Sequence, residues 1–206
     1  MESAIHIGIA DWCEISQVHG KKYNRVLGIE AIKKSAKTAT TRSNAYNRQH
    51  GTEYQVLNYL VTNEDDKLYQ YNVASNHGHS SSIYKMKEHK DIWKDVKEVE
   101  VQKIKSKRMA TIINDNAIDM NKYDNLIVDV QGAELEVLKS FDDHVNNFKT
   151  IEVEISTIEL YEGQVLFPEL NQFLEDHGYK RTVEPHTFHQ NLIYNKIENE
   201  EIIINL

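Results

Sequence analysis

The sequence predicts an α/β fold in which helices alternate with the strands of a mostly parallel sheet. Its clearest unit is residues 125–141, where a short apolar run rich in β-branched residues is typical of a strand buried on both faces: Leu126, Ile127, Val128 and Val130. Gln131 and Gly132 then predict a turn, and the apolar residues from Ala133 to Phe141 have helical spacing. Asp129 lies near the carboxyl end of this strand, where open α/β sheets bind ligands. A turn or helix-capping carboxylate explains the same position equally well.

Length and composition limit the class of protein. A chain of 206 residues without repeats or linkers predicts one domain over residues 1–206. The very short segment before its first strand suggests a domain cut from a larger protein. The net charge of −8 argues against general nucleic-acid binding. The sequence contains no run of ~18 apolar residues, so no membrane-spanning helix is predicted. Without a signal-peptide pattern, and with Cys13 as the single cysteine, we expect a reducing, cytoplasmic location.

The first half of the chain predicts strands separated by helices. Apolar or alternating segments predict strands at residues 4–10, 25–30, 54–61, 67–73 and 98–104. Helices are expected at residues 12–20, 31–50 and 108–115, the first of them ending at Gly20. Residues 74–82 are polar and predict a flexible loop that contains His77 and His79. An H-x-H pair can bind a metal ion, but without a third ligand it is more often an exposed loop.

The second half predicts the rest of the sheet. Residues 149–156 predict a strand in which Glu152 and Glu154 share one face. Residues 167–177 form an amphipathic helix that Gly178 ends. Residues 179–184 and 190–195 then predict two strands of a terminal hairpin. Residues 198–206 predict either an edge segment or a tail.

Two residues of the first half are candidate cofactor contacts on their position alone. Gly8 follows the first strand, where a glycine lets the backbone approach a ligand, although a lone glycine is more often only a turn. Glu30 ends the second strand roughly 20 residues later, which suits a carboxylate that binds two ribose hydroxyls. Without the fold, Glu30 would be an ordinary charge at a strand end.

Three strings resemble one family. Asp129 to Leu138, D-V-Q-G-A-E-L-E-V-L, is similar at ten consecutive positions to the signature of the FkbM-type S-adenosylmethionine-dependent methyltransferases. E-I-S-T-I-E-L-Y, from Glu154 to Tyr161, resembles that family's E-V-S/N-x-x-E-L-Y, and Q-N-L-I-Y-N resembles its closing strand. The family's first turn, D-I-G-A-N-x-G, is here H-I-G-I-A-D-W. His6 therefore replaces the acid and Trp12 the last glycine.

The resemblance implies a Rossmann-like class I methyltransferase sandwich, a mostly parallel sheet with an antiparallel C-terminal hairpin. It implies transfer of a methyl group from S-adenosylmethionine to an oxygen, with a sugar hydroxyl as acceptor, for example on rhamnose or fucose in a glycan. Catalysis is then expected from Asp129, Glu154 and His79, and a divalent ion, if present, at Asp129 and Glu154. The expected cofactor contacts are Gly8, Ile9, Ala10, Asp11, Glu30, Ala31, Val61, Ser81, Asp129 and Gln131.

Other classes stay open. A nicotinamide-dependent dehydrogenase needs G-x-G-x-x-G after the first strand, and the chain has one glycine there. A nucleotide-sugar glycosyltransferase needs a D-x-D metal site, whereas the acidic pairs at residues 65–66 and 142–143 are adjacent and typical of surface turns. A degenerate methyltransferase fold that only binds is a third alternative, because the first turn has changed.

Overall fold

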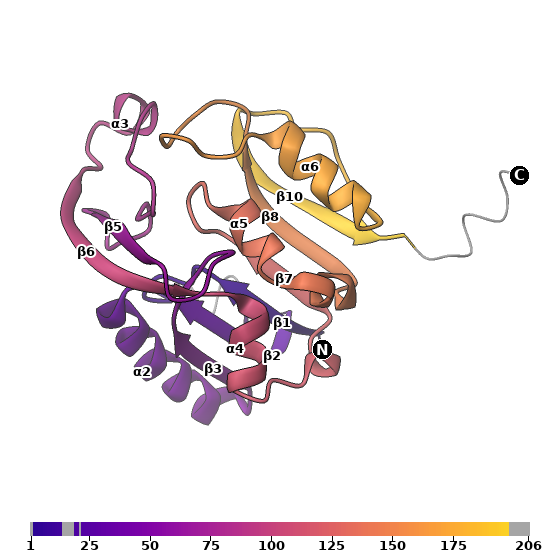
Figure 1. Cartoon of the computed structure of the whole chain (residues 1–206). Helices are drawn as coiled ribbons and strands as arrows, with labels where there is room; N and C mark the ends of the chain where they lie inside the picture. The colour runs from indigo at the N-terminus through magenta and orange to yellow at the C-terminus, as the bar shows by residue number, and fades with distance from the viewer. Residues whose placement is uncertain (1, 14–18, 21, 198–206) are drawn as a thin grey trace, which may run out of the picture.

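The computed structural model describes residues 2–13, 19–20 and 22–197, and within them it shows an α/β fold (Figure 1). A seven-stranded sheet has the order β3-β2-β1-β7-β8-β10-β9, and a second sheet has the order β4-β6-β5. The strands are β1 (Glu2–Ile7), β2 (Tyr23–Glu30), β3 (Glu53–Asn58), β4 (Leu60–Val61), β5 (Leu68–Ala74), β6 (Glu98–Lys107), β7 (Asn125–Val128), β8 (Thr150–Ser156), β9 (Tyr179–Arg181) and β10 (His189–Lys196). The helices are α2 (Lys33–His50), α3 (His89–Ile92), α4 (Met109–Asp115), α5 (Glu134–Lys139) and α6 (Phe167–Asp176), with short 3-10 turns η1 (Met120–Lys122) and η2 (Asp142–Asn147).

The direction of the strands confirms the predicted architecture. β1 pairs in parallel with both β2 and β7, while β3 and β8 extend the parallel part at either side. β10 is antiparallel to β8 and to β9, so the sheet ends in the expected antiparallel hairpin. The first hairpin strand is shorter than predicted, because it ends at Arg181 rather than at residue 184.

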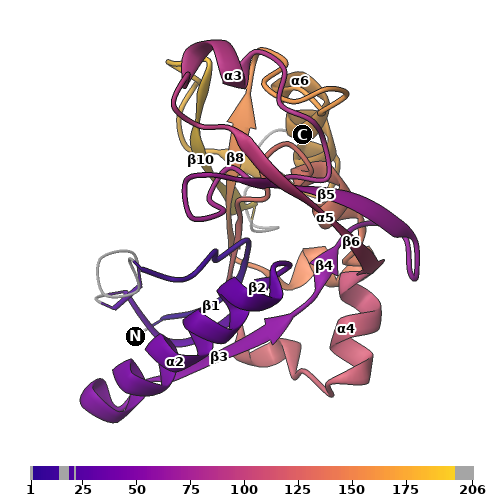
Figure 2. The same ribbon diagram turned by 90° about the vertical axis from the view of Figure 1, so that its left-hand side faces the viewer.

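Helices cover the large sheet on both faces, and each face has its own apolar core. Ile5, Leu27, Leu126 and Val153 face α4, α5 and α6, as part of a cluster that contains Ile112, Leu138 and Leu174. Ala4, Val26 and Ile127 point the other way, toward Ala39 of α2. Figures 1 and 2 show α2 and α4–α6 as separate layers. Adjacent residues of one strand thus enter different cores, as the period of two requires.

The expected strand 54–61 is two strands in two sheets. β3 stays in the large sheet, and the chain then turns at Tyr59, whose backbone N–H donates to the carbonyl of Glu30 at 3.1 Å. β4 pairs with β6 in the small sheet, and β5 pairs with β6 antiparallel. The Ser82 hydroxyl after β5 donates to the carbonyl of Gln131 at 2.7 Å. The small sheet is therefore joined to the edge where β7 ends.

The predicted helices 31–50, 108–115, 133–141 and 167–177 are confirmed as α2, α4, α5 and α6, with ends that differ by a few residues. The predicted helix 12–20 lies mostly outside the described residues, as does the segment 198–206. Across the described ranges, no helix combines the length and the apolar character that crossing a membrane requires.

Candidate active site

The carboxyl ends of β1, β2 and β7 meet at one cleft, because parallel neighbours end at the same edge of a sheet. The cleft holds about 500 Å³ of empty space, part of it open to solvent. Eight residues expected to contact a cofactor line it: Gly8, Ala10, Glu30, Ala31, Val61, Ser81, Asp129 and Gln131. We call it the first cleft.

Gly8, directly after β1, lies against the backbone that follows β7. Its φ is +91°, and a Cβ atom placed there would lie 1.8 Å from the carbonyl oxygen of Asp129. The neighbouring strand ends are held together by Gly8 N–H donating to Ile29 O at 2.9 Å and Asp129 N–H donating to Ile7 O at 3.0 Å. Only glycine fits this position, so the one glycine retained in the first turn holds Asp129 in place.

Glu30 presents a buried carboxyl group to the first cleft. Its Oε1 accepts a hydrogen bond of 2.7 Å from the backbone N–H of Ile32, and the residue is 5% exposed. Burial raises the pKa of Glu30 to about 7, although backbone hydrogen bonds oppose the shift. A bound ligand that donates hydroxyl groups would satisfy this carboxylate, which is the role expected of an acid at the end of the second strand.

Apart from Ala10, the rest of the first turn is directed away from the first cleft. Ala10 and Trp12 both have left-handed backbones, with φ of +47° and +56°. Trp12 is buried, stacks on Tyr54 at 5.5 Å, and donates from its indole nitrogen to His19 Nδ1 at 3.2 Å. The turn therefore keeps a backbone that suits glycine, while the aromatic ring is placed in the α2 core.

Two expected cofactor contacts lie outside the first cleft. The side chain of Ile9 packs against Gly28 in the α2 core, where a Cβ atom on that glycine would be 2.7 Å from Ile9 Cδ1. The carboxylate of Asp11 instead forms an ion pair with Arg42 of α2, with Nη1 and Oδ1 2.7 Å apart. The left-handed residues on either side of Asp11 account for this direction, which spacing alone does not predict.

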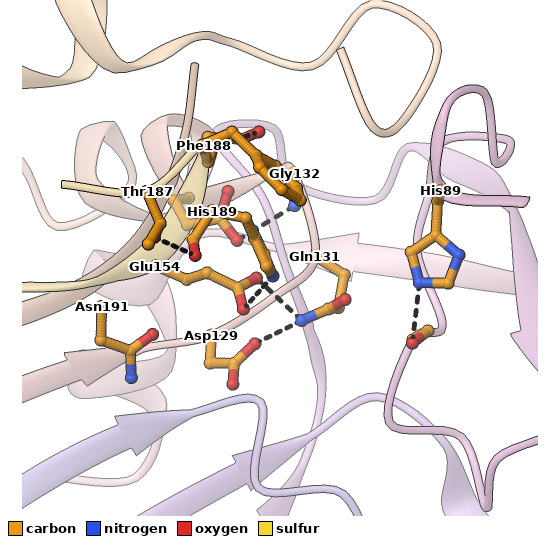
Figure 3. A network of polar contacts seen from close by, with 12 residues as sticks. His89, Asp129, Gln131, Gly132, Glu154, Thr187, Phe188, His189 and Asn191 are labelled. Carbon is orange, nitrogen blue, oxygen red and sulfur yellow. Dashed lines mark hydrogen bonds and ion pairs between the residues drawn. The ribbon is translucent and has the colours of Figure 1, made fainter. Parts of the chain in front are cut away.

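Asp129 and Glu154 are joined by the amide of Gln131 (Figure 3). Gln131 Nε2 donates to Asp129 Oδ1 at 2.7 Å and to Glu154 Oε2 at 2.8 Å. Tyr161 donates to the Gln131 Oε1 atom at 2.7 Å, so both ends of the amide are bound. His189 Nε2 lies 3.1 Å from Glu154 Oε1 on the far side. The network holds the two carboxyl groups in fixed positions.

The two carboxyl groups favour one shared negative charge. Burial raises the pKa of both, and the charge of Asp129 raises the pKa of Glu154 further, well above its ordinary value. Hydrogen bonding from Gln131 and the nearby His189 and His79 limit the rise for Asp129. Glu154 is therefore the member that keeps the proton, and Asp129 is the member that carries the charge.

The expected catalytic residues occupy different places around Asp129. Asp129 lines the first cleft and also a second cleft of about 720 Å³, and His79 lines both as well. Glu154 instead lines a smaller cavity, with Tyr161 and His189. Asp129 and His79 can thus touch ligands in the two clefts, whereas Glu154 acts on Asp129.

The second cleft lies on the α2 face of the large sheet. Cross-strand pairing aligns His6 of β1, Ile127 of β7 and Glu152 of β8 in one row. Asn191 of β10 donates from Nδ2 to Glu152 Oε1 at 3.1 Å. The second cleft shares Gly8, Ala10, His79 and Asp129 with the first. The two clefts therefore meet at Asp129.

The arrangement around Asp129 and Glu154 does not resemble a metal centre. The space between their carboxylates is occupied by the N–H donors of the Gln131 amide, which a cation would have to replace. Within the described ranges, three potential metal ligands come together elsewhere, at Asp11, Cys13 and His79. A metal ion at Asp129 and Glu154 stays a prediction without support from the geometry.

Some site residues were not predicted from the sequence. Tyr71 lines the first cleft near Glu30 and Asp129, and burial raises its pKa well above the ordinary value. Glu134 accepts backbone hydrogen bonds from Val130 at 3.1 Å and Gly132 at 3.0 Å. Burial and the charge of Glu154 raise the pKa of Glu134 to about 8. The sequence places Glu134 in the first turn of a helix, which was the available signal for a role at this turn. The burial of Glu134 could not be predicted, because Tyr161 and Gln164, which are distant in sequence, pack over the turn.

Comparison with solved structures places the fold among methyltransferases. Sp1610 of Streptococcus pneumoniae, described as a candidate tRNA methyltransferase, aligns with a TM-score of 0.51 and 11% identity over 98% of this chain and 68% of that chain. A ribosomal protein L11 methylase from Lactobacillus delbrueckii subsp. bulgaricus aligns with a TM-score of 0.49 and 11% identity, over 95% and 70% of the two chains. No curated protein sequence matches. The family model for the methyltransferase FkbM domain matches residues 5–181, and the chain therefore belongs to the FkbM methyltransferase family.

Proposed function

We propose that this protein is an S-adenosylmethionine-dependent O-methyltransferase whose acceptor is a sugar hydroxyl. The observation that carries the proposal is the meeting of two clefts at one charged carboxylate, Asp129. The first cleft has the acid and glycine positions that suit an adenosyl cofactor. The second is polar and opens on the other side of the same residue.

In the first cleft, the chain's groups match the parts of the cofactor. The Glu30 carboxylate is placed to accept hydrogen bonds from two ribose hydroxyls, and the bare backbone at Gly8 allows close approach of the methionine part. Ala31 and Val61 supply apolar walls for the adenine. The negative charge of Asp129 favours a sulfonium nearby.

The chemistry needs little from the protein beyond alignment and one proton transfer. S-adenosylmethionine, when bound, would supply an activated methyl group, with its sulfur as a leaving group that keeps the bonding electron pair. Asp129 accepts the proton of the acceptor hydroxyl as the oxygen forms its bond to the methyl carbon. Gln131 holds the carboxylate in one orientation, and the protonated Glu154 leaves the charge on Asp129.

The second cleft has the chemistry of a sugar site. His6 of β1, Glu152 of β8 and Asn191 of β10 present donors and acceptors, and Trp12 adds an apolar surface. Glu152 and Asn191 are already hydrogen-bonded to each other, so both are oriented before a ligand binds. A sugar offers several hydroxyl groups in fixed directions, and such a row of polar groups can bind them.

Mass spectrometry of candidate glycans tests the proposal. Glycans incubated with protein and S-adenosylmethionine are expected to gain one methylene unit per acceptor, and a repeat with EDTA tests dependence on a metal ion. Asp129→Asn removes the base and is expected to lower the rate by about a hundredfold or more, whereas the exposed Asp143→Asn serves as a matched control. Full activity in Asp129→Asn would remove Asp129 from the mechanism.

One observation favours a second candidate, a methyltransferase fold that has lost catalysis. Trp12 replaces the last glycine of the family's first turn and sits in a left-handed conformation that is costly for a bulky residue. In such a protein the second cleft would still bind a sugar, while the first would bind no adenosyl compound. Binding of S-adenosylhomocysteine by the folded protein separates the two candidates.

A further inference from the structure

We propose that Asp11, Cys13 and His79 form a binding site for a zinc-type divalent cation at the edge of the second cleft. The three residues come from the turn after β1 and from the loop after β5. Their ligand atoms, one from each residue, all lie within 4.8 Å of one another. This site is separate from the Asp129 and Glu154 pair and does not depend on the proposed function.

The distance between the sulfur and nitrogen ligands already fits a shared ion. Cys13 Sγ and His79 Nε2 are 3.8 Å apart. With Zn–S of about 2.3 Å and Zn–N of about 2.0 Å at a tetrahedral angle, one zinc ion separates its two ligands by roughly 3.5 Å. For these two ligand atoms, binding therefore requires a movement of only a few tenths of an ångström.

The backbone around the three ligands brings them together. Asp11 lies between Ala10 and Trp12, whose φ values are +47° and +56°. In the other loop, His77 and Gly78 have φ of +58° and +87° immediately before His79. Left-handed residues of this kind turn the chain sharply, and outside glycine they are uncommon. The two turns place three ligand types at one point, although the residues are distant in sequence.

Asp11 is also held in place from behind. Arg42 Nη1 donates to the Asp11 backbone carbonyl at 2.7 Å and to its Oδ1 atom at 2.7 Å, and Cys13 N–H donates to Oδ1 at 3.1 Å. Asp11 is therefore a ligand whose orientation is fixed before any metal ion binds.

The ligand types determine which metal fits. A thiolate, an imidazole and a carboxylate suit Zn²⁺, whereas Mg²⁺ and Ca²⁺ prefer oxygen ligands alone. On binding, the Cys13 thiol loses one proton to solvent and the histidine stays neutral. Three protein ligands leave a fourth position open, as in catalytic zinc sites. Cys13 and His79 both line the second cleft, so the open position lies at its wall.

Cobalt spectroscopy tests the site without relying on activity. Co²⁺ added to the metal-free full chain is expected to give a thiolate-to-cobalt charge-transfer band, which Zn²⁺ then abolishes by displacement. Cys13→Ser is expected to remove the band, and His79→Gln to weaken Co²⁺ binding by more than about tenfold. His77→Gln is the matched control, because it changes a histidine of the same loop that is not among the three ligands. It should leave binding unchanged.

Two results would overturn the site. One is the absence of a charge-transfer band at saturating Co²⁺ in protein whose circular dichroism shows it to be folded. The other is an equal loss of affinity in His77→Gln and His79→Gln, which would show unspecific binding by the loop. Calorimetry with S-adenosylhomocysteine on the same sample tests the proposed methyl transfer separately. Metal binding can fail while cofactor binding is retained, and the reverse is also possible.

Discussion

The two turns that border Asp129 are built in opposite ways. The turn after β7 has Gln131 and Gly132 at positive φ, and the amide of Gln131 and the carboxylate of Glu134 satisfy its polar groups. The turn after β1 has Ala10 and Trp12 at positive φ and is stabilised by apolar packing of the Trp12 ring on Tyr54. The turn after β7 is thus held by a polar network. The turn after β1 is held by apolar packing, although neither of its two left-handed residues is glycine.

Gly8 is where the two turns touch, and Gly8→Ala is expected to have the largest effect. The new methyl group would lie 1.8 Å from Asp129 O, so β1 and β7 would have to separate, and we expect a loss of about 4 kcal/mol or more in the free energy of unfolding. Gly51→Ala is the control, because φ is +66° there and nothing lies within 4 Å of the added atom. It should cost only about 1 kcal/mol. Equal losses in urea unfolding would refute the close contact.

Trp12→Gly tests whether packing or backbone strain dominates the first turn. Glycine relieves the left-handed strain by about 1–2 kcal/mol, but loss of a buried tryptophan costs about 3–5 kcal/mol. We therefore expect the free energy of unfolding, measured in urea, to fall by about 2 kcal/mol, with the turn after β7 unaffected. A variant more stable than the wild type would mean that the ring contributes little.

The buried acids of the two turns predict a pH dependence. Burial raises the pKa of Glu30 to about 7 and of Glu134 to about 8, so the folded protein holds more protons than the unfolded chain above pH 4.5. The contribution of these two groups to the free energy of unfolding is therefore fully present at low pH. It is lost as pH rises to about 8, by on the order of 1 kcal/mol per pH unit for each proton. Buried His19, with a pKa lowered to about 4, acts in the opposite direction below pH 6.5.

Unfolding free energies measured between pH 7.5 and 8.5 isolate the acids, chiefly Glu134, because the histidines whose pKa is lowered by burial are neutral in both states there. We expect stability to fall across this range, and Glu134→Gln, which remains neutral, to make the curve flatter. A rise in stability over the same range would contradict the burial of ionisable acids at this edge.

The smallest expected effect is at Ala10. Ala10→Gly removes left-handed strain without removing a packed side chain, so we expect a gain of about 0.5–1 kcal/mol in stability. The reverse change in the other turn, Gly132→Ala, should destabilise, since its φ is +98° and the added atom would lie 3.0 Å from Gln164 Cβ. Thermal unfolding of the two variants compares them. If both variants changed stability in the same direction, the proposed difference between the two turns would be wrong.

Much of the fold and the position of the site could be predicted from the sequence. Apolar runs and turn residues placed the strands, and the rule that parallel strands end together brought Gly8, Glu30 and Asp129 to one cleft. The directions of Ile9 and Asp11 could not be predicted, because they depend on left-handed backbone at residues whose type does not indicate it. The position of His189 beside Glu154 depends on the register of β10 against β8. Nothing local in the sequence specifies that register.

Calorimetry with S-adenosylhomocysteine tests the central claim most directly. The folded wild-type protein is expected to bind one equivalent and to give no heat with NAD or a UDP-sugar. Glu30→Gln is expected to weaken binding by about tenfold or more, because a charged acceptor for the ribose hydroxyls is lost. Absence of binding, or equal affinity in Glu30→Gln and the wild type, would contradict the assignment of the first cleft to the cofactor.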